Sequence, residues 1–204
     1  RQPFFLYLPH NMPGSSRQPF ASEAFRGQSK NGAWGDAVEE LDWAAGQIFD
    51  ALKKYNIDER TLVIWTSDNG APRRNPPQGS NAPLGGWGYT TAEGGMRVPA
   101  LVRWPHFIPA GSVSDELCTL MDLLPTFAKL AGAQLPERKR DGQNIWPVWS
   151  PRNAKSPHDH FFYYHTHSLQ AIRDTRWKLV LGRNPKLYDL KTDSSEKTNL
   201  AAEH

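Results

Sequence analysis

The chain has 204 residues, 38% of them hydrophobic and 22% charged, which is enough for one large domain or a domain with a small appendage. Its net charge of +3 is mild and its only basic triplet is Arg138-Lys139-Arg140, so the composition argues against nucleic-acid binding. No apolar run approaches the about 18 residues of a membrane span, and a single cysteine excludes an internal disulfide framework.

The first third of the chain has the pattern of a β-α-β unit. Residues 4–8 are almost continuously apolar, which predicts a central strand, and because this pattern starts at once, we expect the sequence to begin inside a domain. Residues 11–31 are polar and rich in glycine and serine, which predicts a loop able to rim a site. Residues 36–55 carry apolar side chains at helical spacing, and residues 61–66 form the second strong strand pattern. Strand, helix and strand in this order predict two parallel strands joined by a right-handed crossover.

The middle of the chain alternates loops with short elements. Residues 71–87 are rich in proline and glycine and predict a loop, and residues 98–104 predict a short strand. Residues 117–130 have a helical pattern that contains Pro125. Because proline disfavours the helical conformation of the residue before it, we expect one short helix to end at Leu124 and another to cover residues 126–131.

The last third has the pattern of a small antiparallel sheet. Short strands are predicted at residues 161–165, 169–174, 177–181 and 186–188, with a hairpin turn at residues 173–176 and a helix at the end. Residues 134–157 are rich in Pro, Arg, Lys and Asn. We therefore expect an α/β domain at residues 1–134, a linker at 135–157 and an antiparallel subdomain at 158–204.

The strand at residues 61–66 runs directly into Ser67-Asp68-Asn69-Gly70. A buried strand that ends in a carboxylate and an amide delivers oxygen ligands to the edge of a sheet, where ligands bind in open α/β folds. Two adjacent hard oxygen donors favour Ca²⁺ or Mg²⁺ over zinc. The alternative is an Asx-turn that only ends the strand.

Four histidines are spaced in two alternating pairs, His158 with His160 and His165 with His167. Alternation places each pair on one face of a strand, where two imidazoles could share a zinc ion. No third ligand is evident, so partly exposed histidines at a β-edge are the alternative. A further interpretation is that this strand borders a substrate cleft.

Five stretches of the chain resemble, in family order, the second half of a formylglycine-dependent sulfatase of the alkaline-phosphatase-like superfamily. They lie at residues 3–13, 67–70, 85–105 and 114–126, and at 187–190 with 198–200. The resemblance implies an α/β fold, part of an alkaline-phosphatase-like central sheet flanked by helices, plus a small C-terminal antiparallel α+β subdomain. It also implies hydrolysis of an aryl or carbohydrate sulfate ester and a periplasmic or secreted location.

The resemblance assigns metal ligands but no catalytic residue. It implies Ca²⁺, with Mg²⁺ possible, held in part by Asp68 and Asn69. The family's formylglycine comes from a Cys-x-Pro-Ser/Ala-Arg motif that this sequence lacks. Cys118 has no Pro-Ser-Arg after it, and we expect it to be a buried apolar residue. The positions of the family's usual histidine and lysine are occupied by Gly14 and Gly88.

Three residues are candidates for substrate binding by their place near these motifs: His10, Trp87 and Thr91. The expected ligand is a sulfated small molecule or glycan, and the expected partner is an N-terminal half or a second copy of the chain. Three functions stay open. They are part of a working sulfatase, a sulfatase-like module without catalysis, and a related hydrolase of phosphate or phosphonate esters.

Overall fold

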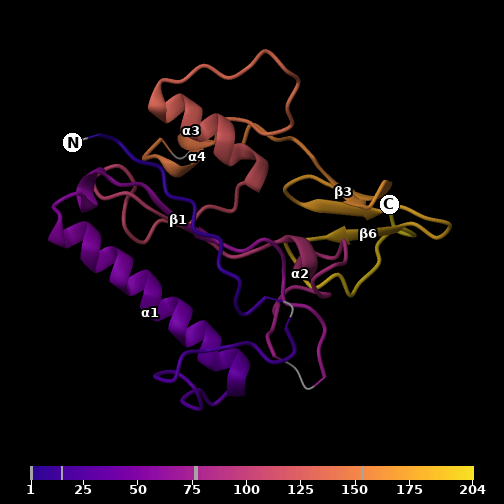
Figure 1. Ribbon diagram of the computed structural model, residues 1–204. Helices are drawn as coiled ribbons and strands as arrows, with labels where there is room; N and C mark the ends of the chain where they lie inside the picture. The colour runs from indigo at the N-terminus through magenta and orange to yellow at the C-terminus, as the bar shows by residue number, and fades with distance from the viewer. Residues whose placement is uncertain (1, 15, 76–77, 153) are drawn as a thin grey trace. The chain divides into compact units, whose positions relative to one another are not determined.

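The computed structural model describes residues 2–14, 16–75, 78–152 and 154–204 (Figure 1). Two compact units are present. The first comprises Arg1–Asp58 and Ala71–Ser80, and the second comprises Glu59–Gly70 and Asn81–His204. None of the helices within the described ranges is long and apolar enough to cross a membrane.

The first unit is built on the long helix α1 (Gly32–Lys54), which confirms the predicted helix and begins four residues earlier. The buried Asp36 carboxylate accepts backbone hydrogen bonds from Gly27 and Ser29, both 2.8 Å long. These bonds hold the preceding loop on the start of the helix. Gly35 is required there, because an added Cβ would lie 2.1 Å from the Ser29 hydroxyl oxygen.

The predicted strand at residues 4–8 does not form, so this prediction and the β-α-β unit that includes it are wrong for the described chain. The five side chains are 49–76% exposed. A β-strand needs a neighbour to accept and donate its backbone hydrogen bonds. The described residues of the first unit contain no such strand.

The second unit begins with the 3₁₀ turn η1 (Asp58–Arg60) at its boundary and then a two-stranded sheet. β1 (Val63–Thr66) and β2 (Ala100–Arg103) confirm both predicted strands to within two residues at each end. The two strands pair with each other in an antiparallel register, in which Val63 lies opposite Arg103 and Thr66 lies opposite Ala100. Both strands are only partly buried. The short helix α2 (Glu93–Met96) lies just before β2 in the sequence.

The helical pattern around Pro125 divides earlier than predicted, into the 3₁₀ turn η2 (Leu120–Asp122) and α3 (Leu123–Ala131). Pro125 lies in the first turn of α3, where its missing N–H would have no helical partner in any case. α3 ends at Gly132, whose φ of +67° is the left-handed conformation that glycine adopts without strain. Cys118 is exposed, so its predicted burial is wrong.

The segment predicted as a linker contains α4 (Trp146–Trp149). Two backbone N–H groups of this segment donate hydrogen bonds to side chains of η2 and α3. The buried Asp122 carboxylate accepts the backbone N–H of Gln143 at 2.8 Å, and the Thr126 hydroxyl accepts that of Ile145 at 3.0 Å. The division of the chain at residues 134 and 157 stays a prediction.

The C-terminal part is a four-stranded antiparallel sheet, which confirms the prediction (Figure 1). Its strands are β3 (Phe161–His165), β4 (Ser168–Arg173), β5 (Trp177–Val180) and β6 (Lys186–Asp189), in the order β3-β4-β5-β6. The predicted hairpin turn between β4 and β5 is also confirmed. The predicted terminal helix is wrong. Residues 190–204 form turns, in which Asp193 and Asn199 accept backbone hydrogen bonds that a helix would otherwise provide.

Candidate functional site

The turn after β1 packs directly against the turn at α2, backbone against backbone. The Gly70 N–H donates to the Gly95 carbonyl at 3.0 Å. A Cβ on Gly70 would lie 1.8 Å from the carbonyl oxygen of Gly94, and a Cβ on Gly88 would lie 2.2 Å from that of Gly70. Contacts this short exclude any side chain at these positions unless the loops move. This close approach of the two backbones explains why Gly70 and Gly88 are glycines.

Asp68 and Asn69 follow β1 at this packed turn. The Asp68 side chain is exposed and makes no hydrogen bond or ion pair with any residue that the structure describes. Asn69 is half-buried, and its backbone carbonyl accepts the Ser67 hydroxyl at 3.0 Å. The carboxylate oxygens of Asp68 are therefore available to a cation. The side-chain hydrogen bond of an Asx-turn is not made by Asp68.

These two residues fit a hard cation only as part of a larger set. Ca²⁺ takes about 6–8 oxygen ligands, and a carboxylate with an adjacent amide supplies a few of them. Within the described ranges, no group of three or more His, Cys, Asp and Glu residues is placed to hold a metal ion. The donor chemistry of Asp68 and Asn69 therefore fits Ca²⁺ or Mg²⁺.

A cavity of about 280 Å³ lies beside Asn69. It is lined by Asn69, by residues 89–91 and 95–96 of the loop around α2, and by residues 164–166 at the tip of the β3–β4 hairpin. The cavity thus joins the candidate metal-binding turn to the C-terminal sheet within one compact unit.

The three candidate substrate-binding residues fall in different places. Thr91 lines the cavity. Trp87 does not line it, and instead its backbone carbonyl accepts the Thr90 hydroxyl at 2.6 Å. His10 is an exposed residue of the first unit, and its role stays a prediction. Sequence reasoning did not find Tyr89, whose only signal was its place next to the glycines of the loop.

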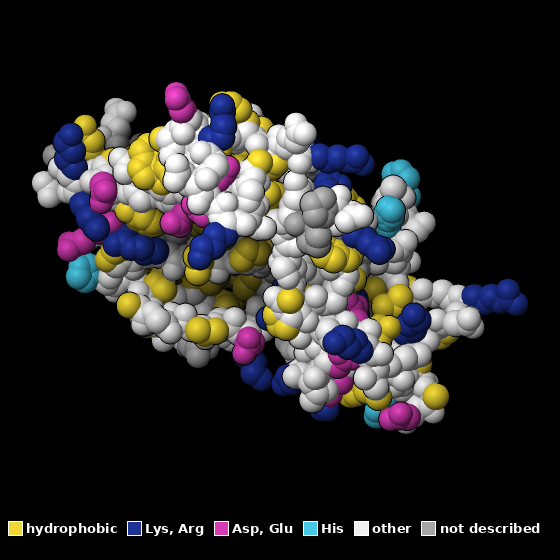
Figure 2. Space-filling model, turned by 90° about the horizontal axis from the view of Figure 1, so that it is seen from below, with side chains coloured by type: hydrophobic (Ala, Val, Ile, Leu, Met, Phe, Trp, Pro, Cys, Tyr) yellow, Lys and Arg dark blue, Asp and Glu magenta, His cyan; other side chains and the backbone are white. Residues whose placement is uncertain are grey.

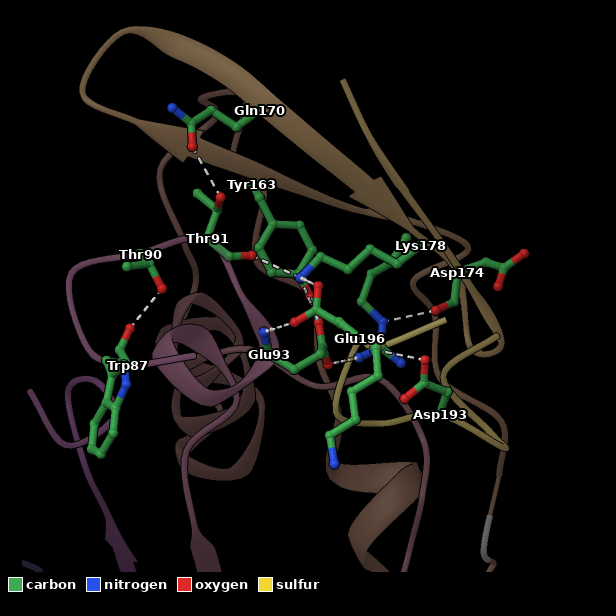
Figure 3. Close-up of polar contacts among 12 residues, drawn as sticks. Trp87, Thr90, Thr91, Glu93, Tyr163, Gln170, Asp174, Lys178, Asp193 and Glu196 are labelled. Carbon is green, nitrogen blue, oxygen red and sulfur yellow. Dashed lines mark hydrogen bonds and ion pairs between the residues drawn. The ribbon is translucent and has the colours of Figure 1, made fainter. Parts of the chain in front are cut away.

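The loop that carries Thr91 is fixed by a buried ionic cluster (Figure 3). Glu93 is fully buried, and its carboxylate accepts the Tyr163 hydroxyl at 2.6 Å, Arg173 Nη1 at 2.5 Å and Lys178 Nζ at 3.1 Å. Lys178 is also fully buried and donates to the backbone carbonyl of Thr91 at 2.7 Å. α2 is thereby fastened to β3, β4 and β5.

A second carboxylate completes the cluster. Glu196 Oε1 pairs with Lys178 Nζ at 2.8 Å, and Glu196 Oε2 accepts the backbone N–H of Glu93 at 2.7 Å (Figure 3). Two carboxylates thus face the two cationic groups Lys178 and Arg173. The sequence analysis did not identify Lys178, because its partners lie up to 87 residues away along the chain and local patterns do not indicate such contacts.

The pKa values of Glu93 and Tyr163 indicate that this cluster has a structural role and does not transfer protons. Burial alone would raise the pKa of Glu93, but the adjacent Lys178 and Arg173 outweigh it, so the pKa lies below the ordinary value. Burial and the adjacent Glu93 carboxylate raise the pKa of Tyr163, so its hydroxyl stays a donor. The cluster therefore holds the cavity loop in place as an ionised network.

The histidine pairs separate in the structure. His158 is largely buried, and its Nε2 lies 2.7 Å from the Asp122 carboxylate, so it does not share an ion with His160. His165 lines the cavity, whereas His167 is exposed and does not. The structure thus favours the interpretation in which the His165 strand borders a cleft over a shared zinc site.

Cys118 is not an activated nucleophile in this structure. Partial burial of its sulfur, followed by the charges of Asp122 and Glu116, raises the pKa of the thiol to about 12. A thiol with such a pKa stays protonated near neutral pH, and only the thiolate is nucleophilic. This agrees with the absence of a Pro-Ser-Arg sequence after it.

Two family models match the chain. The sulfatase model matches residues 1–133, and the model of the C-terminal part of N-sulphoglucosamine sulphohydrolase matches residues 89–204. The chain belongs to the sulfatase family. The two matches together cover the packed turns, the cavity and the C-terminal sheet.

Curated relatives of the chain include a steryl-sulfatase and an N-acetylgalactosamine-6-sulfatase. It is 41% identical over 179 residues to steryl-sulfatase of Mus musculus, covering 84% of this chain and 28% of that protein. It is 42% identical over 180 residues to N-acetylgalactosamine-6-sulfatase of Sus scrofa, covering 86% of this chain and 34% of that protein. The chain thus spans about a third of the length of the curated relatives that it matches.

Solved structures share the fold of this sulfatase-family chain. The crystal structure of Ps i-CgsB has a TM-score of 0.84 at 32% identity, covering 98% of this chain and 46% of that one. That protein has also been solved in complex with k-i-k-neocarrahexaose. A phosphonate monoester hydrolase of Agrobacterium radiobacter has a TM-score of 0.59 at 26% identity, covering 84% of this chain and 37% of that one. The fold is therefore sulfatase-like, although the described part forms small antiparallel sheets and no parallel central sheet.

Proposed function

We propose that the protein, expressed from its complete gene, hydrolyses a sulfate ester and that this chain supplies part of its metal site and of its substrate cavity. One observation carries the proposal. In a member of the sulfatase family, the available oxygens of Asp68 and the side chain of Asn69 follow β1 at a turn that packs on the Glu-Gly-Gly loop beside a cavity. Metal ligands and a substrate cavity at one place are what ester hydrolysis requires.

Asp68 and Asn69 would hold a Ca²⁺ ion, or Mg²⁺ in its place, together with ligands from a region outside this chain. When bound, the ion supplies Lewis-acid stabilisation of the negative charge on the sulfate oxygens. The role of the chain's own residues is to present oxygen ligands and to shape the cavity. The packed glycines keep the Asp68-Asn69 turn and the α2 loop in fixed register.

The chain does not supply the nucleophile. Gly14 and Gly88 have no side chain to donate a proton, and an added Cβ on Gly88 would also lie 3.2 Å from Asn69 Oδ1. Catalysis therefore needs a Cys-x-Pro-Ser/Ala-Arg region encoded elsewhere in the gene. We expect the 204-residue chain alone to release no sulfate above background, because it has no group able to form the covalent intermediate.

The test is sulfate release by the protein from its complete gene, with 4-nitrophenyl sulfate and monosaccharide sulfates as substrates. Asp68→Ala should lower kcat/KM by about 100-fold or more, since it removes a charged metal ligand. Asp50→Ala, on the exposed surface of α1, is the matched control and should leave activity unchanged. Equal activity in Asp68→Ala and the parent protein would contradict the proposed metal role.

A phosphonate or phosphate ester is the second candidate substrate, favoured by the likeness to the phosphonate monoester hydrolase. That structure is 26% identical to this chain, whereas the curated steryl-sulfatase and N-acetylgalactosamine-6-sulfatase are 41% and 42% identical, which favours sulfate. Parallel assays with 4-nitrophenyl sulfate and a 4-nitrophenyl phosphonate separate the two. A larger kcat/KM for the phosphonate would replace the sulfatase proposal, and binding without turnover would favour a non-catalytic module.

A further inference from the structure

Apart from Asn69, the cavity is lined by two segments to which no metal or nucleophile role has been assigned. One is the loop around α2, which contributes Tyr89, Thr90, Thr91 and Met96. The other is the tip of the β3–β4 hairpin, residues 164–166. At about 280 Å³, the cavity lies at the lower end of the about 300–1,000 Å³ range of small-molecule sites, so it suits one ring rather than a fused ring system.

Two cavity residues have a backbone conformation that costs energy for their residue type. Tyr89 has a φ of +67°, and Thr166 has a φ of +52°. Thr166 is β-branched and lies in a two-residue hairpin turn, a position at which glycine is the common residue. Such conformations cluster at functional sites, because the surrounding structure must hold them. Both residues lie in exposed parts of the cavity wall, and Tyr89 is 65% exposed.

The cavity wall combines aromatic faces with hydrogen-bond acceptors. Tyr89 and Tyr164 are 65% and 55% exposed, so their rings are open to a ligand. The Thr90 hydroxyl donates a hydrogen bond to the Trp87 carbonyl at 2.6 Å, and the Thr91 hydroxyl donates one to Gln170 Oε1 at 2.9 Å. A hydroxyl that already donates offers its lone pairs as acceptors. These two threonines therefore suit a ligand that donates hydrogen bonds, such as a ring with several hydroxyl groups.

The lack of charged side chains in the cavity wall also favours a neutral, hydroxylated ligand. Of the residues that line the cavity, none is Asp, Glu, Lys or Arg, and His165 is the one titratable side chain besides the two tyrosines. A fused hydrocarbon would cover the acceptor lone pairs of the Thr90 and Thr91 hydroxyls without supplying a donor, which costs binding free energy. A uronate carboxylate would find no arginine or lysine partner there.

We infer that this cavity is a subsite for a neutral, hydroxylated sugar ring of the sulfate ester and that Tyr164 and His165 are its specificity-determining residues. The inference rests on the proposed function, because Asn69 joins the subsite to the proposed metal site. Tyr164 supplies an aromatic face to the ring, and His165 supplies a hydrogen bond to a ring hydroxyl. The C-terminal sheet thus selects the ester, while the turn after β1 binds the metal.

The test measures binding rather than turnover, so a protein that fails to hydrolyse sulfate still tests the subsite. Methyl β-galactopyranoside, N-acetylgalactosamine, 4-nitrophenol and cyclohexanol are titrated into the protein from its complete gene by saturation-transfer NMR. Both sugars should bind, and cyclohexanol, a ring of similar size with one hydroxyl, should bind more weakly. Tyr164→Ala should weaken sugar binding about three- to tenfold, the effect of losing one aromatic contact.

The matched controls lie on the same hairpin. His165→Ala should weaken sugar binding about threefold or more, the effect of one hydrogen bond. His167→Ala, two residues further along and outside the cavity, should bind as the parent does, and Tyr164→Phe should retain binding because it keeps the ring. Tyr164 and His165 are exposed, and circular dichroism of each variant confirms that its fold is kept. Equal sugar binding in Tyr164→Ala, His165→Ala and His167→Ala, or tighter binding of 4-nitrophenol than of either sugar, would overturn the inference.

Discussion

The ammonium group of Lys178 lies 3.1 Å from the Glu93 carboxylate and 2.7 Å from the Thr91 carbonyl, and neither charged side chain is exposed to solvent. One lysine on β5 therefore binds both the first residue of α2 and the cavity loop before it. Its ammonium also lies 4.3 Å from the centre of the Tyr163 ring, a cation–π contact. The geometry of the cavity thus depends on the C-terminal sheet.

We expect Lys178→Met to lower the free energy of unfolding by about 3–5 kcal/mol, because it leaves the buried Glu93 and Glu196 carboxylates without their shared partner. Lys191→Met, an exposed lysine after β6, should change it by less than about 0.5 kcal/mol. Urea unfolding followed by circular dichroism measures both. A loss below about 1 kcal/mol for Lys178→Met would mean that water reaches this cluster.

The same cluster predicts a dependence of stability on pH. The pKa of Glu93 is lowered in the folded protein, so the unfolded state binds more protons than the folded state at acidic pH. The contribution of Glu93 is therefore fully present above the ordinary glutamate value of 4.5 and is lost as the pH falls through the folded value. In Glu93→Gln, urea midpoints measured from neutral to acidic pH should fall less steeply below that value than in the parent. Parallel curves would show that other carboxylates dominate.

The parts of the fold that were predictable are those whose contacts are local in sequence. The strands β3 to β6 follow from alternation and short turns, and α1 follows from its apolar spacing. Residues 4–8 are apolar, as a buried strand would be. A strand also needs a neighbouring strand, and the local sequence does not show whether one lies beside it. The Glu93–Lys178 pair spans 85 residues, and local patterns contain no information on such a contact.

The Pro125 prediction failed for a different reason. Proline is incompatible with the interior of a helix but is compatible with its first turn, so the same residue ends one helix or begins another. The Asp122 carboxylate accepts the backbone N–H of Thr119 at 2.7 Å, which fixes the start of η2 just before α3. For the candidate site, Asp68, Asn69 and Thr91 were found from motifs, whereas the hairpin tip came into the cavity through tertiary packing alone.

Restoring a lysine at residue 88 should not restore a functional group in the cavity. In Gly88→Lys, the new Cβ would lie 2.2 Å from the Gly70 carbonyl oxygen, so the packed turns must separate. We expect a loss of about 1–3 kcal/mol in the free energy of unfolding, the usual cost of overpacking. Gly46→Lys, at a position of α1 where an added Cβ meets nothing within 4 Å, is the control. Thermal unfolding of both variants decides, and an unchanged midpoint for Gly88→Lys would show that the turns open easily.

Calcium should bind the 204-residue chain weakly, with a dissociation constant of about 1 mM, because Asp68 and Asn69 supply few of the about 6–8 oxygens that the ion takes. Isothermal titration calorimetry with CaCl₂ measures this, with Asp68→Ala expected to abolish the heat and Asp50→Ala to retain it. Micromolar affinity that depends on Asp68 would contradict the prediction. It would mean that residues within this chain complete the coordination shell.

The chain alone should associate with itself. Residues 4–8 expose apolar side chains, Tyr7 by 76% and Leu6 by 61%, and apolar side chains are also visible across the face shown in Figure 2. An exposed apolar segment favours association between chains, because contact with a second copy removes its side chains from water. Leu6→Lys should therefore shift the chain toward the monomer, because a charge on this segment opposes pairing. Gln2→Lys adds the same charge outside the segment and should have a smaller effect. Size-exclusion chromatography with light scattering over a range of concentrations measures the association. If the parent chain is a monomer at every concentration and unfolds in one cooperative transition, the segment is covered in solution by the chain itself.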